Sequence, residues 1–314
     1  MSFAKLAGIT WNHTRGFLPL VATAQRFSEL NPAVTIEWHR RSLQEFADAP
    51  IERLAERFDL LIIDHPFAGY AATYPTLLAL DQHLPSEFLA DQVAHSVGAS
   101  HASYALGGHQ WALAIDTATP VSAYRPDLLE RYATRPPATW DDLLALARRG
   151  LVALPAIPID SLMNFYMLCN GLGEPPFSNN EQVVGPDVGV GALEMLRELV
   201  SLCAPACFQR NPIATYEALI GGDDLVYCPF AYGYSNYARP EYTTRPLRFG
   251  GLVRLNNRPL RSTLGGTGLA ISARCRHTQS ALDYAQFVAS PACQRGMYAA
   301  GGGQPGHRQA RVSQ

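Results

Sequence analysis

Residues 60–63 form a continuous apolar run, Leu-Leu-Ile-Ile, which lies between Asp59 and Asp64. A strand with one face in water alternates polar and apolar residues, whereas a strand that is covered on both faces is apolar throughout. The run therefore predicts a central strand of a sheet with helices on both faces, as in α/β proteins with mostly parallel strands. Asp64 and His65 would then lie just beyond the carboxyl end of this strand.

The N-terminal residues show the two periodicities that such a fold requires. Residues 17–27 carry apolar side chains at helical spacing, whereas residues 34–38 alternate apolar and polar side chains. We therefore expect a strand that ends at Trp11, a helix with Pro19 in its first turn, and then a second strand. The polar residues 12–16, Asn-His-Thr-Arg-Gly, would form the loop between the first strand and the helix.

Polar side chains thus follow two strands of the same predicted sheet. In an open parallel sheet, the loops at the carboxyl ends of the strands line the ligand crevice. The candidate ligand contacts at this edge are Trp11, Asn12, His13, Arg15, Asp64 and His65. A capped and solvated turn is the alternative interpretation of the first loop, because loops carry polar residues for many reasons.

A second set of alternating elements follows. Thr139 after a Pro-Pro turn predicts the start of a helix. The later patterns predict a strand and loop at residues 151–160, an amphipathic helix at 191–203 and a strand at 224–230. The aromatic loop after this last strand contains Tyr232, Tyr234 and Tyr237. Aromatic faces suit the C–H surfaces of sugars, although alternate tyrosines should point to opposite sides.

The composition limits the classes of function. The chain has 314 residues, of which 47% are hydrophobic and 17% charged, and a formal net charge of −2. This is typical of a soluble globular chain that is long enough for one or two cores, so we expect two lobes. The charge balance argues against nucleic acid and acidic membrane surfaces as partners. No apolar stretch is long enough to predict insertion into a membrane.

The N-terminus shows neither the basic segment nor the cleavable apolar stretch of a secretory signal. As written, the chain is therefore expected in the cytoplasm, and in the periplasm or outside the cell if a signal has been removed. Cysteines in the cytoplasm stay reduced. The cysteines that we expect as free thiols are Cys169, Cys203, Cys207, Cys228, Cys275 and Cys293. A disulfide or half of a metal site is the alternative for Cys203 and Cys207.

The order of segments along the chain resembles the family 1 extracellular solute-binding proteins, the carbohydrate-type binding components of ABC importers. The segments that carry the resemblance are FDLLIIDHPFAGYAA, QWALAIDTATPVSAYRPDLL, PPATWDDLLALA, DLVYCPFAYGYSNY, LGGTGLAIS and ALDYAQFVASPACQRGMYAAGGGQPGHR. The resemblance covers nearly the whole chain, and PATWDDLL is its most specific motif.

The resemblance implies the type II periplasmic-binding-protein fold. In this fold two α/β lobes, each a mostly parallel sheet flanked by helices, hold a ligand in the cleft between them. Lobe 1 would comprise residues 1–116 and 264–314, and lobe 2 residues 117–263. The hinge crossings would lie near residues 112–120 and 260–268.

The resemblance also implies the kind of ligand and partner. Asp116 and Thr117 at the hinge, and the three tyrosines of lobe 2, join the candidate contacts of a sugar, polyol or small organic acid. An ABC transporter permease would be the protein partner. Other members of the family continue into helices that return to lobe 2, so we expect exposed apolar surface there and self-association through it.

An alternative function is a cytoplasmic enzyme or ligand sensor built on the same fold. An aspartate and a histidine could act as general base while Arg15 holds an anionic substrate. Asp64 and His65 are neighbours on a strand, however, and such side chains point apart. The sequence contains no nucleophile elbow, metal-ligand spacing or cofactor fingerprint, so we predict no catalytic residue, no metal and no cofactor.

Overall fold

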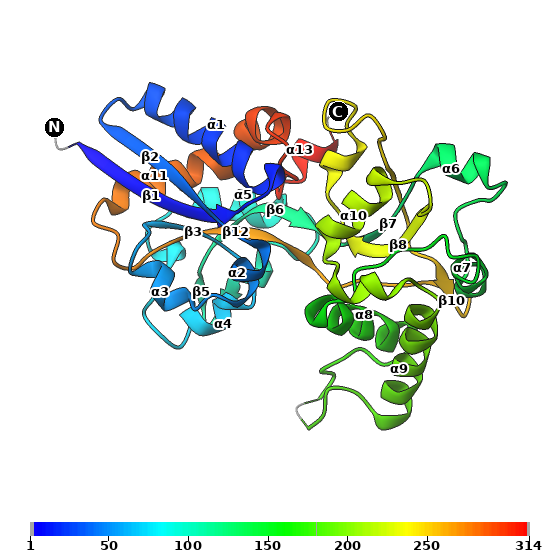
Figure 1. Ribbon diagram of the computed structural model, residues 1–314. Helices are drawn as coiled ribbons and strands as arrows, with labels where there is room; N and C mark the ends of the chain where they lie inside the picture. Colours follow the sequence, from blue (N-terminus) through cyan, green and yellow to red (C-terminus); the bar gives the residue numbers. More distant parts are fainter. Residues whose placement is uncertain (1–2, 180, 313–314) are drawn as a thin grey trace. The chain divides into compact units, whose positions relative to one another are not determined.

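The computed structural model describes residues 3–179 and 181–312 and divides into two compact units (Figure 1). Unit 1 comprises Met1–Ala118 and Leu264–Gln314, and unit 2 comprises Thr119–Thr263. Each unit contains hydrophobic clusters of its own.

Unit 1 is built on a five-stranded sheet with the order β2-β1-β3-β12-β6. The strands are β1 (Ala4–Trp11), β2 (Val34–Arg41), β3 (Leu60–Ile63), β6 (Leu113–Ala118) and β12 (Gly265–Ile271). β1 is parallel to β2 and β3, whereas β12 is antiparallel to both of its neighbours, β3 and β6. Four strands therefore run in one direction, and their carboxyl ends lie at the same edge of the sheet.

Helices cover both faces of this sheet, as the apolar run of β3 predicts (Figure 1). Leu60 and Ile62 belong to the cluster that includes residues of α1 (Thr14–Leu30) and α11 (Thr278–Ala289). Leu61 and Ile63 belong to the opposite cluster, with α3 (Ile51–Ala55) and α4 (Phe67–Ala71). Both faces of the strand are therefore buried, because successive side chains point to opposite sides.

α1 begins at Thr14, so the prediction of a five-residue loop over residues 12–16 is wrong. The connection from β1 contains only Asn12 and His13. His13 Nδ1 accepts a hydrogen bond from the Arg15 backbone N–H at 3.0 Å and thus caps the helix. Gly16 packs flat against the Trp11 indole, where an added Cβ would lie 2.4 Å from ring atoms. These two contacts allow the helix to start directly beside the strand end.

The other elements of unit 1 are short. They are α2 (Leu43–Asp48), η1 (Leu80–Gln82), α5 (Ser86–Ala94), η2 (Ala102–Tyr104), β4 (Ala105–Leu106), β5 (His109–Gln110), α12 (Pro291–Cys293), the π-helical turn η5 (Gln294–Tyr298) and α13 (Gln309–Val312). β4 and β5 form a small antiparallel pair.

Unit 2 contains a three-stranded sheet with the order β8-β7-β9. Its strands are β7 (Pro120–Tyr124), β8 (Tyr227–Tyr232) and β9 (Arg248–Gly250), and a separate antiparallel pair is formed by β10 (Arg254–Leu255) and β11 (Arg258–Pro259). Its helices are α6 (Pro126–Arg131), α7 (Trp140–Ala147), α8 (Pro158–Gly171), α9 (Pro186–Ser201), η3 (Pro205–Gln209), α10 (Pro212–Gly221) and η4 (Ser235–Ala238).

Both pairings in the three-stranded sheet are antiparallel, whereas the resemblance implied a mostly parallel sheet in each lobe. The predicted strand at residues 151–160 contributes only one parallel bridge, between Val152 and Tyr227. Pro155 has no N–H to donate to a neighbouring strand. The N–H of Ala156 bonds instead to the Cys207 carbonyl at 3.0 Å, so the segment leaves the sheet.

Other predictions for unit 2 are confirmed. Thr139 caps α7, and its hydroxyl and the Asp142 carboxylate form a reciprocal capping box. α9 is amphipathic and buries Leu196 and Leu199.

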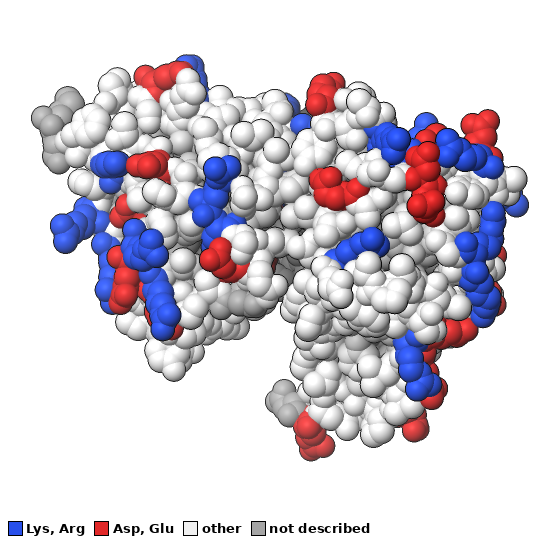
Figure 2. Space-filling view, viewed as in Figure 1, with Lys and Arg blue, Asp and Glu red and all other residues white. Residues whose placement is uncertain are grey.

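No helix among the described residues combines the length and hydropathy that a membrane crossing requires. All six cysteines lie in described segments and are free thiols. On the visible face of each unit, acidic and basic side chains are interspersed (Figure 2).

Candidate functional site

The carboxyl edge of the unit 1 sheet gathers the polar residues that follow its strands. Asn12 and His13 follow β1, and Asp64 and His65 follow β3, which is parallel to β1. Asp116 lies near the carboxyl end of β6. The two polar segments therefore lie at one edge, as we expect from the parallel pairing.

Arg15 and Asp116 bind each other at this edge. Arg15 Nε donates to Asp116 Oδ2 at 3.2 Å, and Nη2 donates to Oδ1. The side chains of Arg15 and Asp116 are only 4% and 0% exposed, and the Gln304 N–H donates to Oδ2 at 3.0 Å. The pair is therefore a buried ionic connection between the first turn of α1, β6 and the C-terminal segment.

His13 is also buried and bonded within the protein. It is 9% exposed, and burial, followed by the charge of Arg15, lowers its pKa to about 4. The imidazole is therefore neutral near pH 7. The alternative interpretation, a capped and solvated turn, is wrong about solvation for His13 and Arg15, because both are buried and bonded.

Asp64 differs from these residues because it is partly exposed. Its side chain makes no hydrogen bond within residues 3–179 and 181–312. Burial raises its pKa to about 7, against the opposing charges of Arg15 and Arg41 and with a smaller contribution from Asp116. Near neutral pH the group is therefore a mixture of a carboxylate, which accepts hydrogen bonds, and a carboxylic acid, which also donates one.

Two neighbours of Asp64 complete the accessible part of the edge. His65 is partly exposed, lies edge-on to the Tyr104 ring at a centroid distance of 6.5 Å, and has its pKa lowered by burial. Asn12 is exposed, and its Oδ1 accepts a hydrogen bond from Arg40 Nη1 at 3.4 Å. The edge thus offers a carboxyl, an imidazole and an amide.

Trp11 and Thr117, the remaining predicted contacts of unit 1, are buried. Trp11 is 3% exposed and packs on Phe46 with a ring-centroid distance of 5.4 Å. Thr117 donates its hydroxyl to Ser100 Oγ at 2.9 Å. Little of either side chain is accessible, and their contact with a ligand stays a prediction.

Arg41 belongs to the same edge and was missed by the sequence analysis. It ends β2, and its guanidinium donates to the Ile62 carbonyl at 2.9 Å, which fixes the end of β3 just before Asp64. Burial lowers its pKa to about 10. The alternation of β2 places Arg41 with the exposed positions 35, 37 and 39, so the pattern gave no sign of its burial.

The three tyrosines of unit 2 differ in accessibility. Tyr232 is partly exposed, and its hydroxyl bonds to Thr263 Oγ1 at 2.8 Å. Tyr234 is 4% exposed, and Tyr237 is fully buried and donates to Glu217 at 2.6 Å. The accessible aromatic candidate is therefore Tyr232.

Asp160, in the first turn of α8, is a second residue that the sequence analysis missed. It is 6% exposed, and its buried Oδ2 has no hydrogen-bond partner among the described residues. Burial raises its pKa to about 7. One turn later, Asn164 is also buried and donates to the Pro155 carbonyl at 3.4 Å. The signal was the acidic residue two positions after Pro158, in the first turn of a helix that begins at a proline.

These contacts do not support the enzyme alternative. The His13 nitrogen that faces the helix already accepts a backbone hydrogen bond, and a histidine with a pKa of about 4 is a weak base near pH 7. Arg15 is bound to Asp116 and does not offer its charge to an anionic substrate.

Residues 55–311 match the family described as bacterial extracellular solute-binding protein. No curated protein matches the sequence. Solved structures with the same fold include maltose-bound MalE3 of T. maritima, at 17% identity and a TM-score of 0.80, over 99% of this chain and 83% of that chain. The GacH receptor of Streptomyces glaucescens is similar at 15% identity and a TM-score of 0.81, over 100% and 82%. A solute-binding protein of Agrobacterium radiobacter in complex with ribitol is similar at 16% identity and a TM-score of 0.80, over 99% and 82%.

Proposed function

The chain belongs to the family of bacterial extracellular solute-binding proteins, and we propose that it binds a neutral sugar or polyol for an ABC importer. The carboxyl of the partly exposed Asp64 carries this proposal. A carboxyl group with a pKa of about 7 pairs well with hydroxyl groups, because it accepts hydrogen bonds when ionised and donates one when protonated.

The charges at the edge favour a neutral ligand over an organic acid. Arg15, which could neutralise a carboxylate ligand, is already bound to Asp116, and His13 is neutral. An anionic ligand would instead face the partly ionised Asp64. The similar solved structures that hold maltose, ribitol, tagatose and mannitol support the same ligand class.

Under this proposal, Met1–Ala118 with Leu264–Gln314 is one lobe and Thr119–Thr263 is the other. Unit 1 would supply Asp64, His65 and Asn12, which bind hydroxyl groups. A contact between the Tyr232 ring of unit 2 and the C–H face of a sugar stays a prediction.

A panel of maltose, ribitol, mannitol, tagatose and small dicarboxylates tests the proposal, with the rise in melting temperature as the first readout. A sugar or polyol that stabilises the protein is then titrated by calorimetry into the wild type and Asp64→Asn. Loss of a charged hydrogen bond should weaken binding about ten- to a hundredfold. Asp141→Asn, at an exposed position of α7, is the control and should bind like the wild type.

The pH dependence of affinity provides a second readout. Because the carboxylate accepts ligand hydroxyls, affinity should rise as the pH increases through about 7, and Asp64→Asn should remove this dependence. Stabilisation by dicarboxylates alone, or equal affinity in the wild type and Asp64→Asn, would contradict the proposal.

Self-association through unit 2 stays a prediction. α8 and α9 expose Ile159, Leu162, Val190 and Leu193, which are between 41% and 56% exposed. Sedimentation at increasing concentration tests it, and a monomer throughout the range would contradict it.

A further inference from the structure

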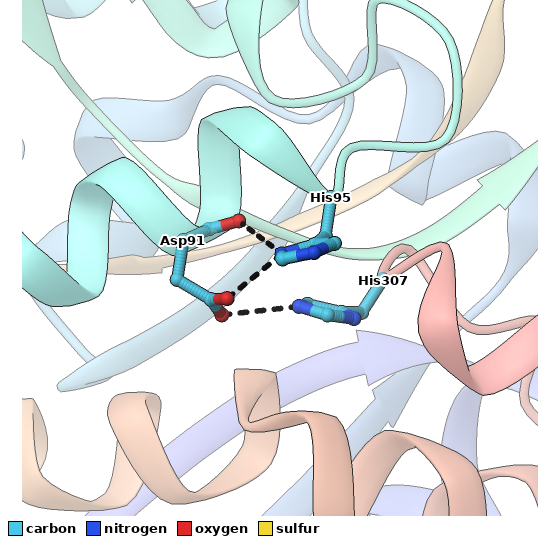
Figure 3. A group of neighbouring side chains, drawn as sticks. All are labelled: Asp91, His95 and His307. Carbon is cyan, nitrogen blue, oxygen red and sulfur yellow. Dashed lines mark hydrogen bonds and ion pairs between the residues drawn. The ribbon is translucent and has the colours of Figure 1, made fainter.

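Three metal-ligating side chains of unit 1, none of which belongs to the candidate ligand contacts, lie close together (Figure 3). Asp91 lies in the last turn of α5, and His95 follows one helical turn later. His307 comes from the C-terminal segment, 216 residues after Asp91. Each side chain offers one ligand atom, and these atoms lie within 4.8 Å of one another.

The Asp91 carboxylate lies between the two imidazoles. Its Oδ1 is 2.8 Å from His95 Nδ1, and its Oδ2 is 3.1 Å from His307 Nε2 (Figure 3). The two rings stack with a centroid distance of 5.0 Å and an interplanar angle of 27°. One nitrogen of each ring therefore faces the same carboxylate group.

Backbone hydrogen bonds hold the ligands in this arrangement. Ser96 and His307 form an antiparallel bridge, the Arg308 N–H bonds to the His95 carbonyl at 2.6 Å, and the Val97 N–H bonds to the Gly306 carbonyl at 3.1 Å. The residues after α5 and the C-terminal segment are thus paired on both sides of the cluster. Such preorganisation lowers the conformational cost of binding an ion.

His307 presents one ring nitrogen to the cluster. Its side chain is 1% exposed, and Nε2 faces the Asp91 carboxylate, whereas Nδ1 is buried without a hydrogen-bond partner among the described residues. Within this part of the chain, Asp91 is thus the one hydrogen-bond partner of the imidazole, and Nε2 is the nitrogen available to an ion. Asp91 and His95 are about one-third exposed, so an ion can reach the cluster from solvent.

We propose that Asp91, His95 and His307 form a binding site for a divalent transition-metal ion of the zinc type. Imidazole nitrogen and carboxylate oxygen are usual zinc ligands, and three protein ligands leave a fourth position for water. Tetrahedral ligands about 2.1 Å from zinc are roughly 3.4 Å apart. The ligand atoms lie within 4.8 Å of one another, so small side-chain shifts would bring them to these separations when the ion replaces the two hydrogen bonds.

Gln309 lies beside the site, with its side-chain amide nitrogen 3.0 Å from His95 Nε2. With the amide turned so that its oxygen faces the ring, Gln309 accepts the His95 Nε2–H on the side opposite Asp91, as outer partners of ligating histidines do. A bound ion would connect α5 to the C-terminal segment. This site is independent of the proposed solute binding.

The full chain, stripped of metal with a chelator, tests the proposal when Zn²⁺ is titrated in by calorimetry. The expected result is one ion per chain and a higher melting temperature with Zn²⁺. His307→Ala and His95→Ala should each weaken binding by about a hundredfold or more, since loss of an outer partner alone costs 10- to 100-fold. His83→Gln, at an exposed histidine outside the cluster, should bind like the wild type.

Asp91→Asn keeps the shape of the side chain, so it tests the site even if a histidine variant fails to fold. It should melt like the metal-free wild type and lose the increase with Zn²⁺. Co²⁺ serves as a spectroscopic probe and should give a tetrahedral spectrum without a thiolate charge-transfer band, which separates this site from the six cysteines. No stoichiometric Zn²⁺ binding, or binding that persists in both histidine variants, would overturn the proposal.

Discussion

Arg15 Nε lies 3.2 Å from Asp116 Oδ2, although 101 residues separate the two positions in the chain. The pair joins the start of α1 to the end of β6, and both side chains are almost completely buried. Two residues that the sequence assigned to a ligand are thus each other's partners. We therefore expect substitution of either residue to change the stability of unit 1.

Arg15→Met or Asp116→Asn should lower the free energy of unfolding by about 3–5 kcal/mol, because each leaves an uncompensated buried charge. Urea unfolding followed by tryptophan fluorescence measures this loss of stability, since Trp11, Trp38 and Trp111 all lie in unit 1. Glu29→Ala, which breaks the exposed pair with Arg26, is the control and should leave stability nearly unchanged. Equal effects of buried and exposed variants would contradict the account.

His13→Asn should flatten the pH dependence of stability between about pH 6.5 and 4. The pKa of His13 is lowered to about 4, so in this range the unfolded chain binds a proton that the folded chain does not. The wild type therefore loses up to about 3 kcal/mol as the pH falls through the range. Asparagine keeps a side-chain acceptor at the helix cap without this titration.

The quantity compared at each pH is the difference in the free energy of unfolding between the wild type and His13→Asn. Other titrating groups, including Asp64 and Asp160, change the free energy of unfolding of both proteins equally. Their contributions therefore cancel in the difference. Parallel curves for the wild type and His13→Asn would show that His13 does not titrate as described.

Asp160→Asn should have the opposite pH dependence. Burial raises the pKa of Asp160 to about 7, so the folded chain holds a proton that the unfolded chain releases above about pH 4. The stabilisation is complete below pH 4 and is lost as the pH rises to 7. Relative to the wild type, the variant should gain at most about 4 kcal/mol over this interval and nothing further above it. Denaturant unfolding at several pH values measures this gain, and a constant difference would contradict it.

Gly16→Ala should destabilise unit 1 by about 1–3 kcal/mol, because the added Cβ would lie 2.4 Å from the Trp11 ring. Gly296→Ala, in the turn η5, is the matched control, since an added Cβ there has no heavy atom within 4 Å. It should be neutral or slightly stabilising. Thermal unfolding of both variants separates the close contact from a general effect of losing glycine.

Local patterns were sufficient to predict much of the fold. The apolar run predicted β3 as a strand covered on both faces, and Thr139 predicted the start of α7. The first helix was placed too late because Gly16 and Pro19 usually disfavour a helix interior. Here Gly16 is required by the Trp11 ring, which lies beside it only in the folded chain.

The site was harder to predict because burial and pairing depend on distant parts of the chain. Position after a strand identified Asp64 correctly as a residue of the sheet edge, but not which neighbours bind each other. Arg15 finds its partner across 101 residues and His307 across 216. No spacing rule in the sequence reveals such pairs, so the metal-ligating cluster was also missed.

Identification of the small molecule that copurifies with the protein tests the central claim most directly. The chain is purified without added sugars, denatured, and the released molecules are analysed by mass spectrometry against a blank and against Asp64→Asn. The account predicts a neutral polyhydroxylated molecule, at up to one per chain, that is strongly reduced in Asp64→Asn. Release of an organic anion instead, in equal amounts from both proteins, would contradict it.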